Sequence, residues 1–221
     1  MASERILVVG GLSGIGRAVV VAQGEARCVV WSRRTGVDAT HERDVQRAAQ
    51  ELLRNGAPWA WVHAVGDFDE RAALASDATF VQAMLTSNLV SAWTVMREIV
   101  PAMQAAGRGR IVFFGAAGVE ARAGLRRAPA YFAAKAALLT LTRALALDLA
   151  PHGVTVNMIS PGVIRHESSH AASQARMVAK VPAGRAGEPR DVVGAVQFLL
   201  SEASGYVTGT NLEVDGGLAL L

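Results

Sequence analysis

The chain has 221 residues, of which 51% are hydrophobic and 19% are charged, and its formal net charge is +3. This length allows one domain or at most a small second one, and the composition is rich enough in apolar side chains to bury a sizeable core. No run of Lys or Arg is long enough for a basic patch, which argues against a nucleic-acid partner.

Three further features bound the setting of the protein. No apolar run approaches the roughly 20 residues of a membrane span, which argues against a membrane partner. Residues 1–5 lead directly into an apolar run, without a signal-peptide cleavage pattern. Cys28 is the only cysteine, which excludes an internal disulfide and fits a reducing compartment. We therefore expect a cytoplasmic protein.

The chain begins with a predicted strand, a glycine turn and a helix. Residues 6–9 form a short β-branched run typical of a buried strand, and a helix is predicted over residues 17–22. Between them, Gly10, Gly14 and Gly16 follow a G-x-x-x-G-x-G spacing. Glycines at such a turn let the backbone approach a pyrophosphate, which then lies at the positive end of the helix. The pattern predicts a dinucleotide site, with a plain strand-to-helix turn as the alternative.

The second predicted strand, residues 26–31, ends in Ser32, Arg33 and Arg34. In dinucleotide folds an acid at this point binds the ribose 2′-OH, whereas an Arg accommodates the 2′-phosphate. Arginine suits phosphate because its planar guanidinium donates two parallel hydrogen bonds. Since no acid is present here, the sequence favours NADP(H) over NAD(H). A solvated pair of arginines is the alternative.

Strands and helices alternate along the rest of the chain. The helix that usually follows the second strand is expected to be missing or reduced to a loop, because Val37 and Asp38 come almost at once. Helices are then predicted over residues 44–54, 76–100, 131–149 and 191–200, and strands over residues 59–66, 110–115, 153–159 and 210–217. This order predicts a single doubly wound α/β domain over residues 1–221, with a parallel sheet of the Rossmann type.

Tyr131 and Lys135 are the candidates for acid–base chemistry. They are four residues apart, which places them on one face of a helix. A nearby ammonium favours the phenolate, so the spacing predicts a lowered Tyr131 pKa and proton exchange near neutral pH. Alone the spacing is a weak signal, because Tyr and Lys are ordinary helix-surface residues. The predicted nucleotide fold around it gives it weight.

Other motifs follow the same order as in a known family. They are Asn88, Ser160-Pro161-Gly162, Gly184-Arg185-x-Gly187-x-Pro189-x-Asp191, Tyr206-Val207-Thr208-Gly209-Thr210 and Val214-Asp215-Gly216-Gly217. With the glycine turn and the Tyr131–Lys135 pair, they make the chain resemble the short-chain dehydrogenase/reductase family over nearly its whole length. The resemblance is greatest to the 3-oxoacyl-[acyl-carrier-protein] reductase branch.

The resemblance implies an NADPH-dependent reductase of a 3-oxoacyl, polyketide-type or small keto substrate, free or bound to an acyl carrier. Tyr131 would give a proton to the developing alkoxide, and Lys135 would lower the Tyr131 pKa and hold the nicotinamide ribose. Asn88 would kink its helix and hold a water that links Lys135 to solvent. Asp38 would contact the adenine. The implied cofactor contacts are Gly10, Leu12, Ser13, Gly14, Ile15, Gly16, Ser32, Arg33, Arg34, Asp38, His63, Ala64, Gly66, Tyr131, Lys135, Pro161, Gly162 and Ile164, the last three at the nicotinamide.

The sequence also departs from the family pattern. The family normally places a catalytic Ser after the strand that corresponds to residues 110–114, whereas this chain reads Gly115-Ala116-Ala117-Gly118 and has no serine between Ser91 and Ser160. Loss of one oxyanion donor typically costs ~10²–10³ in rate. Reduction would then be slow, or would recruit a donor such as His63, His166 or water.

Two further substitutions affect the expected cofactor site. The family's Asn-Asn-Ala-Gly sequence is replaced by residues 63–66, His-Ala-Val-Gly, and the Thr that usually follows Pro-Gly is replaced by His166. Ala116, Ala117, Arg122 and His166 remain the candidate substrate contacts.

Residues 166–170 read H-E-x-x-H, the zinc-protease pattern. That chemistry needs a stable helix and a third ligand, whereas this stretch falls where the family has a flexible substrate loop. We therefore interpret the match as accidental and expect no metal. His166 or His170 facing the substrate is a second hypothesis, and a solvated loop histidine is the alternative.

Arg122, Arg126 and Arg127 precede Tyr131 by a few residues. They are candidates for holding an anionic substrate or an acyl-carrier phosphate, and a charged surface loop is the alternative.

Three functions stay open at this point. The first is the carbonyl reductase, the second a non-redox enzyme such as a cyclase or dehydratase that uses Tyr131, and the third a cofactor-binding protein without turnover. The resemblance and the apolar C-terminal residues 218–221 imply a homotetramer, with a dimer as the fallback.

Overall fold

Six parallel strands form one sheet in the computed structural model, which describes residues 4–120, 127–165 and 177–220. The strands lie in the order β2-β1-β3-β4-β5-β6. Ile6 of β1 lies opposite Cys28 of β2 on one side and Ala60 of β3 on the other, so the strand order reverses beside β1. Their bounds are β1 (Ile6–Val9), β2 (Cys28–Trp31), β3 (Ala60–His63), β4 (Gly109–Phe114), β5 (Val154–Pro161) and β6 (Asn211–Val214).

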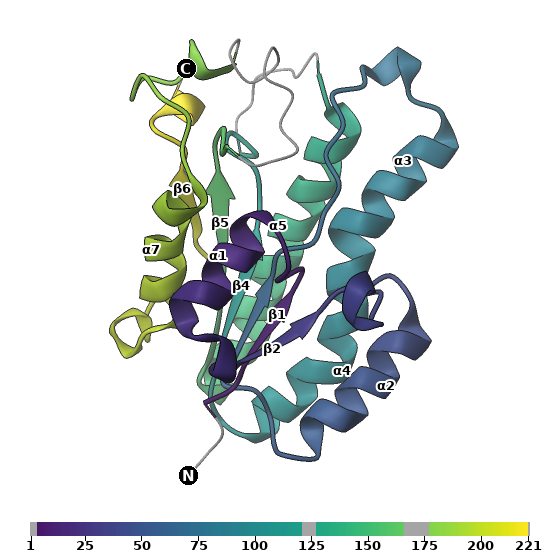
Figure 1. The fold of residues 1–221 in the computed structure, drawn as a ribbon, viewed down its shortest axis with the longest axis vertical. Coiled ribbons are helices and arrows are strands. Elements are labelled where there is room, and N and C mark those ends of the chain that lie inside the picture. The colour runs from purple at the N-terminus through teal and green to yellow at the C-terminus, as the bar shows by residue number, and fades with distance from the viewer. Residues whose placement is uncertain (1–3, 121–126, 166–176, 221) are drawn as a thin grey trace.

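Helices cover both faces of this sheet (Figure 1). On one face α1 (Gly14–Gln23) and α7 (Pro189–Leu200) pack on the strands and on each other. On the other lie α2 (Glu42–Leu53), α4 (Ser91–Ala105) and α5 (Pro129–Leu149). The short helix α3 (Ala78–Leu85) continues into α4 through a π-helical turn, Thr86–Val90. The predicted single doubly wound α/β fold is confirmed.

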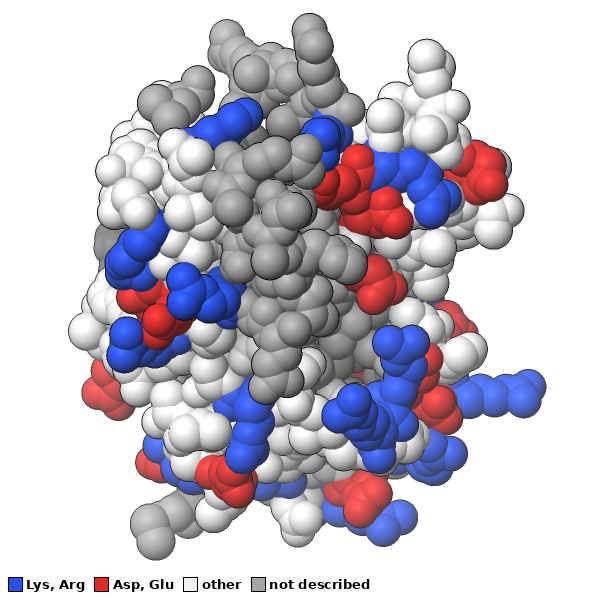
Figure 2. Space-filling view, turned by 45° about the horizontal axis from the view of Figure 1, so that its top comes forward, with Lys and Arg blue, Asp and Glu red and all other residues white. Residues whose placement is uncertain are grey.

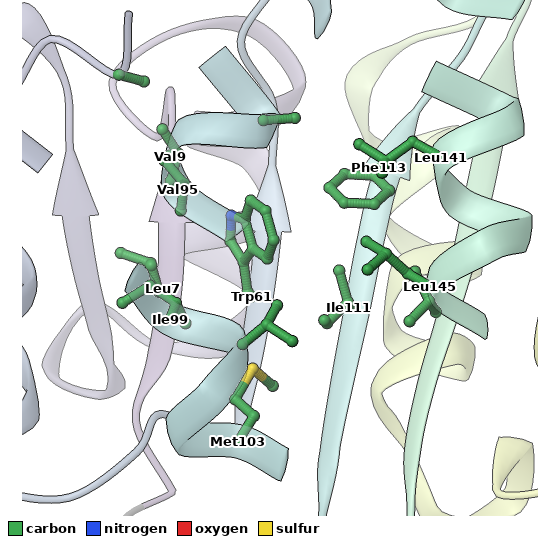
Figure 3. Close-up of a cluster of buried hydrophobic side chains, with 14 of the residues drawn as sticks. Leu7, Val9, Trp61, Val95, Ile99, Met103, Ile111, Phe113, Leu141 and Leu145 are labelled. Atoms are coloured by element: carbon green, nitrogen blue, oxygen red, sulfur yellow. The ribbon is translucent and has the colours of Figure 1, made fainter. Parts of the chain in front are cut away.

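Alternating strand residues explain the two layers of the core. Leu7 and Val9 point to the side of α2 and α4, whereas Ile6 and Val8 point to the side of α1. Because both faces are covered, the central strands are apolar at nearly every position. Trp61 of β3 fills the middle of one layer, between α4 residues such as Ile99 and the sheet (Figure 3).

The predicted elements are present, with shifts at their ends. After β2 the chain makes a single 3-10 turn, Arg33–Thr35. The helix α2, which is 12 residues long, then connects β2 to β3, so the expected reduction of the helix between the second and third strands is wrong for this sheet. The helix predicted to end at residue 100 extends further, because α4 continues through Pro101 to Ala105. The missing N–H of Pro101 is tolerated because the last turn buries Met103 completely against the sheet at Gly109.

The longest described helix is α5, with 21 residues. Residues 129–152 pass a test of length and composition for a membrane span, yet 50% of the tested window is buried inside the protein. Its buried residues, among them Leu138 and Leu145, pack in the core with β5. We therefore interpret α5 as a core helix.

Charged residues of both signs are interspersed over the face shown in Figure 2. Blue and red groups alternate with white ones there, and the described residues form no single-sign field on this face. This distribution agrees with the mild net charge of the sequence.

Candidate active site

The glycine turn lies between the end of β1 and the start of α1. Gly10 has φ +88°, and a Cβ there would lie 2.5 Å from the carbonyl oxygen of Ala64. A Cβ on Gly16 would lie 2.3 Å from the carbonyl oxygen of Gly10. Both contacts are closer than a side chain permits, so these two positions require glycine.

This turn has the features of a dinucleotide cradle. It lies at the carboxyl edge of the sheet, next to the reversal in strand order between β1 and β3, where open α/β sheets bind ligands. Leu12, Ser13 and Gly14 are exposed there, and the Ser13 side chain makes no capping bond to α1. The first backbone N–H groups of α1 are therefore available to an anion. The residues present fit the pyrophosphate of a dinucleotide.

Arg33 and Arg34 are exposed in the turn that directly follows β2. Ser32 fixes this turn, since its hydroxyl accepts the backbone N–H of Thr35 at 3.2 Å. The turn lies beside the glycine turn, because the Gly10 N–H donates to the Trp31 carbonyl at 2.8 Å. Two guanidinium groups thus lie at the edge where a 2′-phosphate is expected.

Asp38 follows this turn and is held by its neighbours. Its Oδ1 accepts the backbone N–H and the hydroxyl of Thr40, at 2.9 and 2.7 Å. Burial acts to raise the pKa of this carboxyl, but the two Thr40 bonds and the charges of His41 and Arg33 keep it below its usual value. Asp38 is therefore a fixed carboxylate close to the arginine turn, and its contact with the adenine stays a prediction.

Tyr131 and Lys135 lie on the first turns of α5, as predicted. Lys135 is 4% exposed, and its ammonium donates to the Phe114 carbonyl at 2.8 Å and lies 5.6 Å from the centre of the Tyr131 ring. The spacing thus brings both side chains to the end of β4, at the same edge as the glycine turn.

The predicted direction of the Tyr131 pKa is wrong for this structure. Burial raises the pKa of the Tyr131 phenol to about 12, and burial lowers the pKa of Lys135 to about 8. Desolvation penalises the charged form of each group. Sequence spacing indicated the nearby cation but carried no information about the apolar surroundings, whose effect dominates.

Asn88 lies in the π-helical turn between α3 and α4, which agrees with the expected kink. Its side-chain nitrogen donates to the carbonyls of Asp67 and Met84, at 2.9 and 3.1 Å. Its Oδ1 is buried without a partner among the described residues. A Cβ on Gly66 would lie 2.2 Å from this oxygen and 3.1 Å from the Lys135 ammonium. The amide oxygen and the ammonium therefore face one small space, the arrangement expected for a bridging water.

His63 ends β3 but lies inside the core. It is 1% exposed, and its ring packs edge-on against Trp61 and Phe113. The Ser91 hydroxyl donates to the Ser87 carbonyl, so it accepts a bond from the Nε2–H of His63 at 3.0 Å. Burial first, and then the charge of Lys135, lower the pKa of His63 to about 3. A neutral, buried ring does not reach a substrate, which argues against recruitment of His63 as a donor.

The loop after β4 brings the remaining described residues to the same edge. Ala116 is buried and Ala117 partly buried, and the Ala117 N–H donates to the Pro161 carbonyl at 3.1 Å. Gly162 is fixed close to β6, since a Cβ there would lie 2.7 Å from the Asp215 backbone. Ile164 pairs with Gly187 in an isolated bridge. No hydroxyl side chain occurs in residues 115–120.

Some predicted residues lie outside the described ranges. These are Arg122, Arg126, His166 and His170, so the H-E-x-x-H stretch is not placed either. Among the described residues, no group of three or more His, Cys, Asp or Glu side chains could hold a metal. Arg127 is described, and it donates to the Glu70 carboxylate at 2.7 Å. The Arg127 side chain is 61% exposed in this ion pair, and its contact with an anionic substrate stays a prediction.

The sequence analysis missed Phe68, whose ring lies 5.0 Å from that of Tyr131 at an interplanar angle of 88°. The only signal was an apolar aromatic residue among three acids, Asp67, Asp69 and Glu70, just after the Gly66 turn.

Comparison with known proteins agrees with this geometry. Residues 13–219 match the family model described as Enoyl-(Acyl carrier protein) reductase. A 3-oxoacyl-[acyl-carrier-protein] reductase of Mycobacterium avium is 30% identical over 239 residues, which cover 99% of this chain and 91% of that protein. Carbonyl reductase family member 4 of Danio rerio is 33% identical over 241 residues, which cover 99% of both.

Solved structures share the same fold over the full chain. A putative NAD(P)-dependent gluconate 5-dehydrogenase from Beutenbergia cavernae, described with bound NADP, is 31% identical with a TM-score of 0.87, covering 100% of this chain and 98% of that one. A putative gluconate dehydrogenase from Agrobacterium tumefaciens is 28% identical with a TM-score of 0.89, covering 100% and 97%. With these matches and the dinucleotide cradle described above, the chain belongs to the short-chain dehydrogenase/reductase family, as an NADP-dependent oxidoreductase.

Proposed function

We propose that the protein reduces the carbonyl group of a 3-oxoacyl, polyketide-type or small keto substrate, free or bound to an acyl carrier. The observation that carries this proposal is the meeting of Tyr131, Lys135 and Asn88 at the carboxyl edge of the sheet, beside the glycine turn. When bound, NADPH supplies the hydride that adds to the carbonyl carbon. The relatives named for 3-oxoacyl and carbonyl reduction support this reaction class.

Tyr131 is the proposed proton donor. With its pKa raised to about 12 by burial, the phenol keeps its proton at neutral pH. An alkoxide is a stronger base than a phenolate, so the proton passes to the product oxygen as negative charge develops there. Lys135 lies beside the ring and stabilises the phenolate that remains. The Asn88 side-chain oxygen has no partner among the described residues and faces the Lys135 ammonium across one small space. A water there would let Lys135 exchange protons with solvent.

The test is NADPH consumption, followed at 340 nm, with a panel of 3-oxoacyl thioesters, simple ketones, quinones and a keto sugar acid. We expect turnover of at least one carbonyl compound, and we expect Tyr131→Phe to abolish it while NADPH still binds. Tight NADPH binding without turnover of any carbonyl compound would contradict the proposal and favour a non-redox or binding role.

We also propose a homotetramer. Large apolar side chains are exposed on α7 and in the C-terminal region, where Phe198 is 44%, Tyr206 104% and Leu220 89% exposed. Exposed apolar surface of this kind marks interfaces between subunits. Light scattering at micromolar concentration tests it: a tetramer or dimer is expected, and a monomer contradicts it. The cytoplasmic location stays a prediction.

A further inference from the structure

Phe68 is an exposed aromatic residue that contacts the proposed catalytic tyrosine. Its side chain is 60% exposed, yet its ring lies edge-on against Tyr131, with 5.0 Å between the ring centres. A single exposed apolar residue needs no explanation. An exposed ring held against a reactive phenol does, because it lies beside the side chain that a substrate must approach.

Two anchors hold the loop that carries Phe68. Before it, the Asp67 carbonyl accepts the Asn88 amide at 2.9 Å, and the Asp67 N–H donates to the Ser87 hydroxyl at 3.3 Å. After it, the Glu70 carboxylate accepts the Arg127 guanidinium at 2.7 Å. The loop is thereby fixed to the π-helical turn on one side and to the start of α5 on the other. In Figure 1 this segment, between β3 and α3, rises along the N-terminal part of α5.

Apart from the Lys135 ammonium, the described ring contact of Tyr131 besides Phe68 is apolar too. Phe132 packs edge-on against Tyr131, with 5.5 Å between ring centres. Where the family pattern has a hydroxyl, the loop after β4 has the methyl groups of Ala116 and Ala117. Burial alone accounts for the raised Tyr131 pKa. A charged or hydroxylated group placed against these surfaces would lose its water without gaining partners.

We propose that Phe68 is a specificity residue and that the substrate carries a flat apolar group, an aryl ring, close to its carbonyl. This inference rests on the proposed reductase function and assigns its substrate class. The ring of the substrate packs against Phe68 while the carbonyl oxygen approaches Tyr131. Aromatic pairs gain ~0.5–1.5 kcal/mol beyond their area burial, which corresponds to a preference of about 2- to 10-fold over a saturated ring of the same size.

Phenylacetone and cyclohexylacetone are the matched probes, because they differ only in the ring and have the same methylene between ring and carbonyl. We expect kcat/KM to favour phenylacetone, and we expect Phe68→Leu to remove about 2- to 10-fold of that ratio. The control is Phe198→Leu, which replaces another exposed phenylalanine far along the chain on α7 and should leave the ratio unchanged, with light scattering to verify that its oligomeric state equals that of the wild type. An unchanged ratio in Phe68→Leu would overturn the inference.

A binding measurement separates this inference from the reductase proposal. Tyr131→Phe protein saturated with NADP⁺ is titrated with each ketone, with and without Phe68→Leu, and the two Kd values are compared. If no ketone is reduced but phenylacetone still binds more tightly in a Phe68-dependent way, the reductase proposal fails and the inference stands. If ketones are reduced and both ketones bind equally, the inference fails and the reductase proposal stands.

Discussion

Tyr131 shows how one residue can have its expected chemistry reversed by its surroundings. The Tyr131–Lys135 spacing predicted a lowered phenol pKa, but burial raises it to about 12. The change favours a phenol that donates a proton over one that has already lost it. Spacing fixes which residues are neighbours on a helix, whereas the pKa depends on every element packed around them.

This reversal can be measured by ultraviolet difference titration. The chain has two tyrosines, Tyr131 and Tyr206, so subtracting the spectrum of Tyr131→Phe isolates Tyr131. We expect no phenolate absorbance at 295 nm from Tyr131 up to pH 10.5 in the protein without cofactor, because burial disfavours the charged form. Phenolate absorbance from Tyr131 below pH 9 would contradict this prediction and would support a Tyr131 pKa lowered by Lys135.

Ala116 is the residue at which activity can be gained. It is buried and follows Gly115 at the end of β4. The Lys135 ammonium donates to the Phe114 carbonyl at this same strand end. We expect Ala116→Ser to supply the missing oxyanion donor and to raise kcat by up to about 10²-fold. Ala117→Ser is the matched control, because it adds the same hydroxyl one residue on, and little change is expected there. A gain in neither variant, with folding intact by circular dichroism, would show that a hydroxyl here is not limiting.

Among the elements, the glycine turn was predictable and the π-helical turn was not. Gly10 and Gly16 are required by contacts below 3 Å with neighbouring backbone, and that requirement leaves a spacing visible in the sequence. The π-helical turn at residues 86–90 depends instead on Asn88 bonding to Asp67, from a different segment. The resemblance supplied a kink at Asn88, but the residues alone did not. Pairings such as Arg127 with Glu70 are likewise non-local and leave no local pattern.

The turn after β2 contains Arg33 and Arg34, which we expect to select NADPH over NADH. Arg33→Ala combined with Arg34→Ala should raise the Kd for NADPH by about 10- to 100-fold, since charge-assisted bonds to a phosphate contribute about 1.5–3 kcal/mol. The Kd for NADH should stay within about 2-fold, since NADH has no 2′-phosphate. Fluorescence titration with both nucleotides measures this, with the exposed Arg43→Ala on α2 as control. Equal loss of both nucleotides would mean that the arginines support the fold or the pyrophosphate rather than the 2′-phosphate.

At the scale of the whole molecule, the alternation of strands and helices was enough to predict the architecture. Each central strand is apolar because helices cover both sheet faces, and each amphipathic helix shows which of its sides is buried. The six-stranded order follows from short connections between neighbouring elements. The substrate does not follow, because it depends on loops such as residues 65–72, which are held by bonds from Asn88 in the π-helical turn and from Arg127 just before α5.

Lys135 links the site to the stability of the whole chain. The residue is 4% exposed, and burial lowers its pKa to about 8, whereas in the unfolded chain a lysine titrates near ~10.4. Between these two values the unfolded chain binds more protons than the native protein, so the free energy of unfolding rises with pH. The contribution of Lys135 titration to the free energy of unfolding is complete above about pH 10.4 and is lost as pH falls through about 8. Its full size is roughly 3 kcal/mol.

Lys135→Met removes this titration and isolates its effect. Compared with this variant, the wild-type protein should gain about 2 kcal/mol of unfolding free energy between pH 7.5 and pH 9.5, measured by urea unfolding without cofactor. Lys180 is the only other lysine and is exposed, so Lys180→Met is the matched control and should follow the wild type at each pH. Tyr131 does not interfere, because its raised pKa affects stability only above about pH 10. A constant difference between wild type and Lys135→Met across this range would mean that the ammonium is solvated in the folded protein, which would also remove the burial argument for the Tyr131 proton beside it.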